Sequence, residues 1–454
     1  IRDSIIFFFI QNFKKLEKEA RIDPPIHCKY FLSEGAVILI FVPFGTKFIK
    51  PLYDSYSFSN IIGTIEYILT GKSENQLPLD VLETLGIDYD KVVLLFVDAL
   101  GWRFIEPRLQ TSEIVKKLEK KGVLSKLTSI FPSTTSAAVP VMNTGKEPVE
   151  TEMIEWRQYN DKVDDIIMPI KFKHGYNRKI DLKGNFGLQP EDVYPANNIY
   201  QRLASQGVQS TTYMGESYAD SEFNKALMNG AEMLPYFTLD EALYGLSEKI
   251  INTHKGKHFM HLYVNYIDDI AHKYGAGSPE LDIQIDNVLR LIDELILQRT
   301  EGKSGKTLLL ITADHGHDVF DPEETIYINK IIPDFEKYLR KNARNEIILP
   351  SGSAKDVFLH INPEFLEEAK SKLEKVLEGL GEVYLSKDLL KQGFFGQKQP
   401  SERFKKIIGD LVLLPYARQS IWWYQGEKYL KTSKGQHGGL SRYEMEIPLF
   451  AYPL

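Results

Sequence analysis

The sequence predicts an α/β fold with a mostly parallel central sheet, helices on both faces and a smaller inserted lobe. Three apolar runs indicate this fold, because each has the length of a strand buried on both faces and each leads into an acidic residue. Open α/β sheets carry their chemistry at the carboxyl ends of the strands, so we expect these three ends to form one site. The runs and the residues that follow them are Val92–Val97 with Asp98, Phe259–Val264 with Asp268, and Thr307–Thr312 with Asp314.

The composition is that of an ordinary globular protein of 454 residues, long enough for one large domain with a lobe or for two domains. A net charge of -7 argues against binding to a nucleic-acid duplex, because such binding is dominated by cations that meet phosphates. A small phosphate ester remains a possible partner. The single cysteine, Cys28, excludes an internal disulfide and a cysteine-based zinc site. It fits a reducing compartment, so we expect a cytoplasmic protein.

We expect residues 1–52 to form a leader of uncertain structure ahead of the main domain at 53–454. Its two apolar runs, Ile5–Ile10 and Ala36–Val42, fall short of the roughly 18 residues that a membrane-spanning helix needs. Basic residues follow the first run, which is the wrong side for a signal peptide. We therefore expect no membrane span.

Helices and strands alternate between residues 57 and 145. A helix at 111–121 has Thr or Ser at its start and Gly122 at its end, as helix caps require. A hydroxyl-rich turn then opens a further helix, so its hydroxyl groups face a positive helix end. The expected elements are helices at 57–70 and 78–86, a strand at 91–98, the helix at 111–121, a strand at 123–130, and the turn and helix at 131–145.

Residues 150–190 have no sustained period and are interpreted as an insertion that caps the site. The α/β alternation then resumes. From residue 322 to 406 the elements become shorter and more charged, which predicts a second lobe. The later elements are helices at 195–207, 239–253 and 279–298, strands at 208–214, 258–264 and 307–312, and late strands at 409–415 and 446–452.

Asp314 and His315 are the strongest candidate metal ligands, because a plain turn after a buried strand does not require a histidine. Gly316 would let the backbone come close to an ion. Asp268 and His272 are four residues apart, so a helical turn places both on one face, although such pairs also arise by chance. His317 is interpreted as an outer or solvent-facing residue, and Asp269 as the fallback for Asp268.

Two further candidates have weaker signals. Asp98 follows a buried strand but could simply cap the turn into Gly101. His437 lies between glycines, which allow a loop to reach into a site but are also typical of a flexible surface loop.

Thr134 and Thr135 precede a helix and could cap it. Alternatively, one of the two is a nucleophile whose hydroxyl group is activated by metal coordination.

Taken together, five motifs resemble the alkaline phosphatase superfamily and, within it, the type I phosphodiesterase and nucleotide pyrophosphatase branch. The resemblance covers residue 91 to the C-terminus with gaps, and it implies a three-layer sandwich of the alkaline-phosphatase type. Each motif alone is weak, but five in the family's order are specific. The motifs are Leu95–Gly101, Phe131–Ser136, Asp268–Gly275, Ala313–Gly316 and Gly435–Gly439.

The resemblance also implies the roles of the site residues. Asp98, Asp314 and His315 would hold one zinc ion, which would also bind the Thr135 oxygen. Asp268, His272 and His437 would hold a second zinc ion, with manganese as a possible substitute. The implied mechanism is in-line attack by Thr135 on phosphorus and hydrolysis of a phospho-threonine intermediate. Thr135 is preferred to Thr134 because its distance to Thr144–Gly145 matches the family's interval.

The sequence departs from the family's pattern at one position that bears on substrate specificity. Members of this branch carry an asparagine that steadies a phosphate oxygen, and the aligned segment Met153–Arg157 lacks it. Nucleotide specificity is therefore not implied, and the expected substrate is a small phosphate ester or a nucleotide. Trp156 could stack on a flat group of that substrate or could belong to the core. Alternatives are a phosphomonoesterase or phosphomutase of the same superfamily, and a non-catalytic metal-stabilised binding protein. A sulfatase is disfavoured, because the only cysteine lies far upstream.

Overall fold

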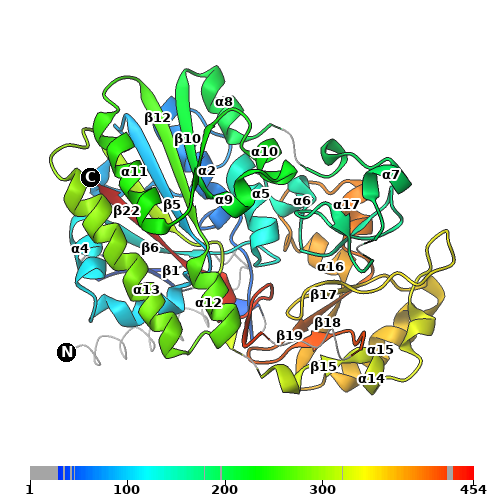
Figure 1. Cartoon of the computed structure of the whole chain (residues 1–454). Helices are drawn as coiled ribbons and strands as arrows, with labels where there is room; N and C mark the ends of the chain where they lie inside the picture. The colour runs from blue at the N-terminus through cyan, green and yellow to red at the C-terminus, as the bar shows by residue number, and fades with distance from the viewer. Residues whose placement is uncertain are drawn as a thin grey trace, which may run out of the picture.

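The computed structural model describes residues 29–33, 36–40, 43–44, 47–177, 179–194, 197–319, 321–426 and 433–454. A twisted nine-stranded sheet forms its centre (Figure 1). Most neighbouring strands in this sheet are parallel, as predicted. In spatial order the strands are β1 (Lys29–Ser33), β2 (Ala36–Ile40), β6 (Val123–Thr128), β22 (Glu446–Pro453), β13 (Thr307–Thr312), β5 (Lys91–Val97), β12 (Lys257–Val264), β10 (Val208–Gly215) and β11 (Glu232–Tyr236).

The three strands singled out by their apolar runs are neighbours at the centre of the sheet. β5 pairs in parallel with β13 on one side and β12 on the other, with Val97 opposite Val264 and Phe96 opposite Thr312. Every residue of β5 and β13 is buried, because helices cover both faces. The carboxyl ends of these strands therefore meet at one edge. β22 and the edge strand β1 run opposite to the other strands, and β22 inserts antiparallel between β13 and β6.

Helices cover both faces, as predicted (Figure 1). The expected helix at 78–86 is instead two short 3₁₀ turns, η2 (Leu79–Val81) and η3 (Glu83–Leu85), because Pro78 and Gly86 bracket too short a span. The expected helix at 195–207 begins only after Asn198, whose side chain caps it. One face carries α2 (Ile61–Thr70), α5 (Thr135–Thr144) and α8 (Ile199–Ser205), and the other carries α4 (Glu113–Lys121), α11 (Leu239–Asn252) and α13 (Pro279–Ile292).

Part of the leader belongs to the central sheet. β1 and β2 form an antiparallel pair, and β2 pairs in parallel with β6. The apolar run Ile5–Ile10 lies outside the described residues. Among the described residues, no helix combines the length and the hydropathy needed to cross a bilayer.

A second sheet organises the lobe. It is antiparallel, with the order β16 (Ser351–Gly352), β17 (Val357–Leu359), β19 (Leu411–Pro415) and β18 (Gly381–Leu385), and α15 (Leu366–Val376) packs on it. β19 joins two cores, because Leu411 and Leu413 face the lobe's own apolar cluster while Val412 and Leu414 face the main core. The lobe's apolar cluster continues to Trp423, beyond the expected end at residue 406.

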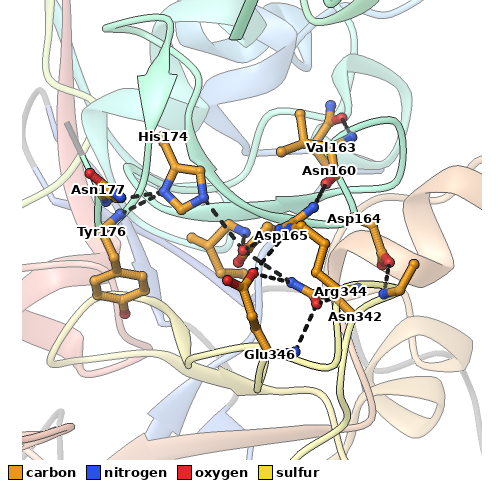
Figure 2. Close-up of polar contacts among 12 residues, drawn as sticks. Asn160, Val163, Asp164, Asp165, His174, Tyr176, Asn177, Asn342, Arg344 and Glu346 are labelled. Carbon is orange, nitrogen blue, oxygen red and sulfur yellow. Dashed lines mark hydrogen bonds and ion pairs between the residues drawn. The ribbon is translucent and has the colours of Figure 1, made fainter. Parts of the chain in front are cut away.

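The segment between α5 and α8 forms a small antiparallel sheet of β7 (Gln158–Asn160), β8 (Asp165–Met168) and β9 (Lys173–His174). Figure 2 shows how this sheet is attached to the lobe. The Asp165 carboxylate accepts hydrogen bonds from Arg344 at 2.9 Å and from Asn342 at 3.3 Å. His174 Nε2 lies 3.4 Å from the same carboxylate, and His174 Nδ1 accepts from the amides of Tyr176 and Asn177.

We expect Asp165→Ala to loosen this junction. Burial alone would raise the pKa of Asp165, but its contacts with His174, the Ile166 amide and Arg344 lower it overall. A lowered folded-state pKa stabilises the fold above the unfolded value near 4, and this stabilisation is lost as the pH falls through the folded value. The variant should therefore lose about 2 kcal/mol of unfolding free energy at pH 7 and much less near pH 3.

Urea unfolding, followed by the fluorescence of Trp422 and Trp423 in the lobe core, measures this loss. Asp161→Ala is the matched control, because Asp161 has only a 3.4 Å contact with the exposed Lys406. Equal losses for the two variants at pH 7 would contradict the assignment of the junction.

Candidate metal centre

The first group of candidate ligands lies at the ends of β5 and β13. We call Asp98, Thr135, Asp314 and His315 the carboxylate-rich cluster. The Thr135 hydroxyl, on the first residue of α5, lies 3.4 Å from both Asp98 oxygens and 3.2 Å from His315 Nε2. His315 Nε2 is also 3.3 Å from Asp314 and 3.5 Å from Asp98. The neighbouring Thr134 has no hydrogen-bond partner for its hydroxyl group among the described residues, so Thr135 is the threonine that joins the cluster.

The second group is built around α12 (Tyr266–Tyr274) and the late glycine loop. We call Asp268, His272, His317 and His437 the imidazole-rich cluster. Asp268 lies 3.4 Å from His272 Nε2, 3.2 Å from His317 Nε2 and 3.6 Å from His437 Nε2. The four-residue spacing on α12 does put Asp268 and His272 on one face, as the sequence predicts.

His317 corrects the sequence interpretation. It is fully buried and lies within the imidazole-rich cluster rather than facing solvent. The ring of His317 meets the rings of His272 and His437 edge to face, with centroid distances of 4.7 and 5.3 Å. The sequence carried a signal, since a second histidine follows the Asp-His-Gly turn two residues later, but only the bend after β13 brings it back toward α12.

The backbone fixes three of the imidazoles for metal binding. Nδ1 of His272, His315 and His437 lies 3.0, 2.8 and 3.2 Å from the carbonyl oxygens of Gly435, Gly316 and Ser133, respectively. A carbonyl can only accept, so each Nδ1 carries the proton and each Nε2 presents a lone pair to its cluster.

The donor atoms match the demands of zinc. Zinc–ligand distances near 2.0–2.1 Å place tetrahedral donors about 3.3 Å apart. The distances within the two clusters run from 3.2 to 3.6 Å. Asp268 Oδ1, Asp314 Oδ2 and both ring nitrogens of His317 are buried without a hydrogen-bond partner among the described residues. Buried polar atoms rarely stay unpaired, so these donors fit a bound cation.

The pKa shifts of the cluster residues also fit a bound cation. Burial, together with the charges of Asp314 and Asp268, raises the pKa of Asp98 well above its ordinary value. Burial also raises the pKa of Asp314 and lowers the pKa of His317 to about 4. Neutral imidazoles beside crowded carboxylates form a site that a divalent cation would stabilise.

The glycines of the motifs permit close backbone packing. A Cβ on Gly101 would lie 2.4 Å from the Gly316 Cα, and one on Gly316 would lie 2.1 Å from the Tyr443 carbonyl oxygen. The missing side chain of Gly316 therefore makes room for the backbone of two other loops, and its approach to an ion stays a prediction. A Cβ on Gly435 would lie 2.7 Å from His317 Nδ1, so this glycine brings the His437 loop against the cluster.

The lobe supports the imidazole-rich cluster. β14 (Asp318–Val319) follows His317 and pairs antiparallel with β21 (Gly435–Gln436), which precedes His437. The fully buried Lys355 of the lobe lies 2.8 Å from Asp318. The charge of this lysine therefore holds the strand that carries the cluster.

A cavity of about 840 Å³ opens beside both clusters. Its lining includes the cluster residues Thr135, Asp98, Asp268, His272 and His437. It also includes residues of the 150–194 segment and of the segment after β10, among them Trp156, Phe172, Tyr194 and Phe223. Trp156 thus faces the cavity, whereas Tyr159 donates a hydrogen bond to Asp164 and packs on His360.

Comparisons with known proteins identify the family and the fold. The family described as type I phosphodiesterase/nucleotide pyrophosphatase matches residues 92–440. Two similar solved structures are the murine and human ectonucleotide pyrophosphatase/phosphodiesterase 5, the murine one as an inactive variant in complex with AMP. Identities are 14% and 16%, TM-scores are 0.58, and the alignments cover 80% of this chain and 88% and 87% of those chains. No curated protein sequence matches the chain.

Proposed function

Because this chain belongs to the type I phosphodiesterase/nucleotide pyrophosphatase family, whose members hydrolyse phosphoric ester bonds, we propose that it cleaves phosphodiester or pyrophosphate bonds with Thr135 as the nucleophile. One observation carries the proposal. The Thr135 hydroxyl lies within 3.4 Å of Asp98 and His315 and also lines the large cavity. The position of this hydroxyl group, between candidate metal ligands and the cavity, supports the role proposed for Thr135.

Two divalent cations, zinc in the first instance and manganese as a substitute, would be held by the two clusters and would supply Lewis acidity to the attacking and leaving oxygens. Asp98, Asp314 and His315 would hold one cation together with the Thr135 oxygen. Asp268, His272, His317 and His437 would hold the other.

The chain's own residues organise the transfer. Thr135 is the first residue of α5, so its oxygen lies at the positive end of the helix dipole, which favours the ionised form. Its oxygen forms a bond to phosphorus while the bond from phosphorus to the leaving group breaks. Water then forms a bond to phosphorus as the bond to the Thr135 oxygen breaks, which releases a phosphate monoester that keeps the retained ester group and restores the free hydroxyl group of Thr135.

Tyr263 fixes the geometry from the sheet. Its hydroxyl donates to Asp98 Oδ2, which leaves the other Asp98 oxygen to face His315 and Thr135. Ser129, directly after β6, donates to the backbone carbonyl of Asp314 and ties the ends of β6 and β13 together across the end of β22. Both contacts restrict the carboxylates to the orientation that surrounds Thr135.

The cavity supports a substrate with two substituents on phosphorus. Its volume lies toward the upper end of the 300–1,000 Å³ typical of small-molecule sites, far more than a phosphate group fills. Trp156 and Phe172 offer flat surfaces for a ring in one of the ester groups. A nucleotide is one such substrate, as AMP is in the murine neighbour.

A substrate panel tests the proposed function. The purified protein with zinc supplied should hydrolyse a chromogenic bis-aryl phosphate and a nucleotide pyrophosphate, and a chelator should abolish both activities until zinc is restored. A phosphate monoester should be turned over more slowly than the matching diester. Faster hydrolysis of the monoester, or no cleavage of either diester substrate, would contradict the proposal.

A further inference from the structure

We infer that the two halves of the centre are built for different cations, with zinc in the imidazole-rich cluster and a harder ion such as Mn²⁺ in the carboxylate-rich cluster. The inference rests on the metal binding of the proposed function and goes beyond it. One cluster offers three imidazoles and a single carboxylate, whereas the other offers two carboxylates, a hydroxyl group and a single imidazole.

His317 increases this inequality. Without it, the imidazole-rich cluster would have two imidazoles and one carboxylate, one donor short of a four-coordinate zinc site. The backbone holds His317 on both sides: Arg103 donates a 2.8 Å hydrogen bond to its carbonyl oxygen, and Asp318 begins the strand paired with Gln436. Its Nε2 is only 3.2 Å from Asp268 Oδ1, and neither ring nitrogen has another partner among the described residues.

The donor atoms predict which of the two clusters prefers zinc over manganese more strongly. Zinc binds more tightly than manganese at nearly any nitrogen and oxygen site, so excess zinc would fill both clusters. Imidazole donors increase the difference between the zinc and manganese affinities of a site, whereas carboxylate and hydroxyl donors decrease it. Four protein donors are also typical of zinc sites that retain their ion. When zinc is limiting, it should therefore collect in the imidazole-rich cluster and leave the other cluster to manganese.

Metal partition tests the inference directly. The metal-free protein is dialysed against one equivalent of zinc per chain and a tenfold excess of Mn²⁺, and bound metals are measured by mass spectrometry and electron paramagnetic resonance. We expect one zinc and one isolated Mn²⁺ per chain. Asp98→Asn should lose the manganese and keep the zinc. Loss of zinc with retention of manganese in that variant, or a statistical mixture in the unmodified protein, would overturn the inference.

His317→Ala tests the role assigned to this histidine. Its zinc affinity, measured in competition with a chromogenic chelator, should fall by at least about tenfold. His360→Ala is the matched control, because His360 is also buried but contacts the Lys406 carbonyl oxygen in the lobe. Equal affinity in the two variants would overturn the assignment. If His317→Ala does not fold, His317→Gln keeps the size of the side chain and should show the same loss.

The result of the metal-partition test can be distinguished from the result of the test of the proposed function. Hydrolysis of the chromogenic diester with excess zinc tests the reaction alone, because both clusters then hold zinc. An active protein with randomly distributed metals would contradict only the present inference. An inactive protein that sorts zinc from manganese would contradict only the proposed reaction.

Discussion

Replacement of Thr135 by alanine should abolish turnover and leave metal binding largely intact. The variant removes the attacking oxygen, and loss of a nucleophile in a covalent mechanism costs several orders of magnitude. We expect kcat for the chromogenic diester to fall by roughly 10³- to 10⁵-fold, which corresponds to about 4–7 kcal/mol of transition-state stabilisation. Asp98, Asp314 and His315 remain, so the carboxylate-rich cluster should still bind its cation, although more weakly. Steady-state kinetics and metal analysis on one preparation measure both effects.

Thr134→Ala is the matched control for this experiment. Thr134 is also buried and precedes Thr135 at the start of α5, but its hydroxyl group has no hydrogen-bond partner among the described residues and its side chain does not cap the helix. Its loss should change kcat less than tenfold. If Thr134→Ala were the inactive variant and Thr135→Ala kept its activity, the nucleophile would be misassigned.

Asp268→Ala should remove one cation and most of the activity. Asp268 is the only carboxylate of the imidazole-rich cluster and lies within 3.6 Å of His272, His317 and His437. Its pKa is lowered despite burial, because these imidazoles surround it. Without Asp268, the imidazole-rich cluster keeps only its three neutral histidines and should bind zinc at least about 100-fold more weakly. The number of zinc ions retained after saturation with zinc and removal of unbound metal should fall from two per chain to one, and kcat should fall about 10³-fold or more.

The neighbouring Asp269 provides the control. Its carboxylate accepts a 2.7 Å hydrogen bond from Asn265 and lies outside the imidazole-rich cluster. Asp269→Ala should retain two ions per chain. If Asp269→Ala lost an ion and Asp268→Ala did not, the register of the ligands on α12 would be wrong.

Much of the fold could be predicted because its signals are local. Each buried strand is an unbroken apolar run, and the chain places an acidic residue where the run ends, as with Val97 and Asp98. Parallel strands then bring those ends to one edge, so local patterns sufficed to anticipate the meeting of Asp98, Asp268 and Asp314. The choice of Thr135 over Thr134 came from the family resemblance instead, and the Thr135 hydroxyl lies 3.4 Å from Asp98.

The remaining features depend on contacts between distant segments. His317 enters the cluster because β14 pairs with β21, more than 100 residues later, and no local pattern reports that pairing. β19 belongs to the lobe because its alternate residues face two different cores, although its apolar run suits a central strand equally well. The close backbone packing at Gly316 could not be predicted for the same reason, since its neighbours Gly101 and Tyr443 lie far away in the sequence.

The location of bound zinc tests the central claim most directly. Anomalous diffraction at the zinc edge, from crystals grown with excess zinc, should show two strong peaks in each chain. One should lie among Asp98, Thr135, Asp314 and His315, and the other among Asp268, His272, His317 and His437. A single peak in each chain, or no peak beside the Thr135 hydroxyl, would contradict the account.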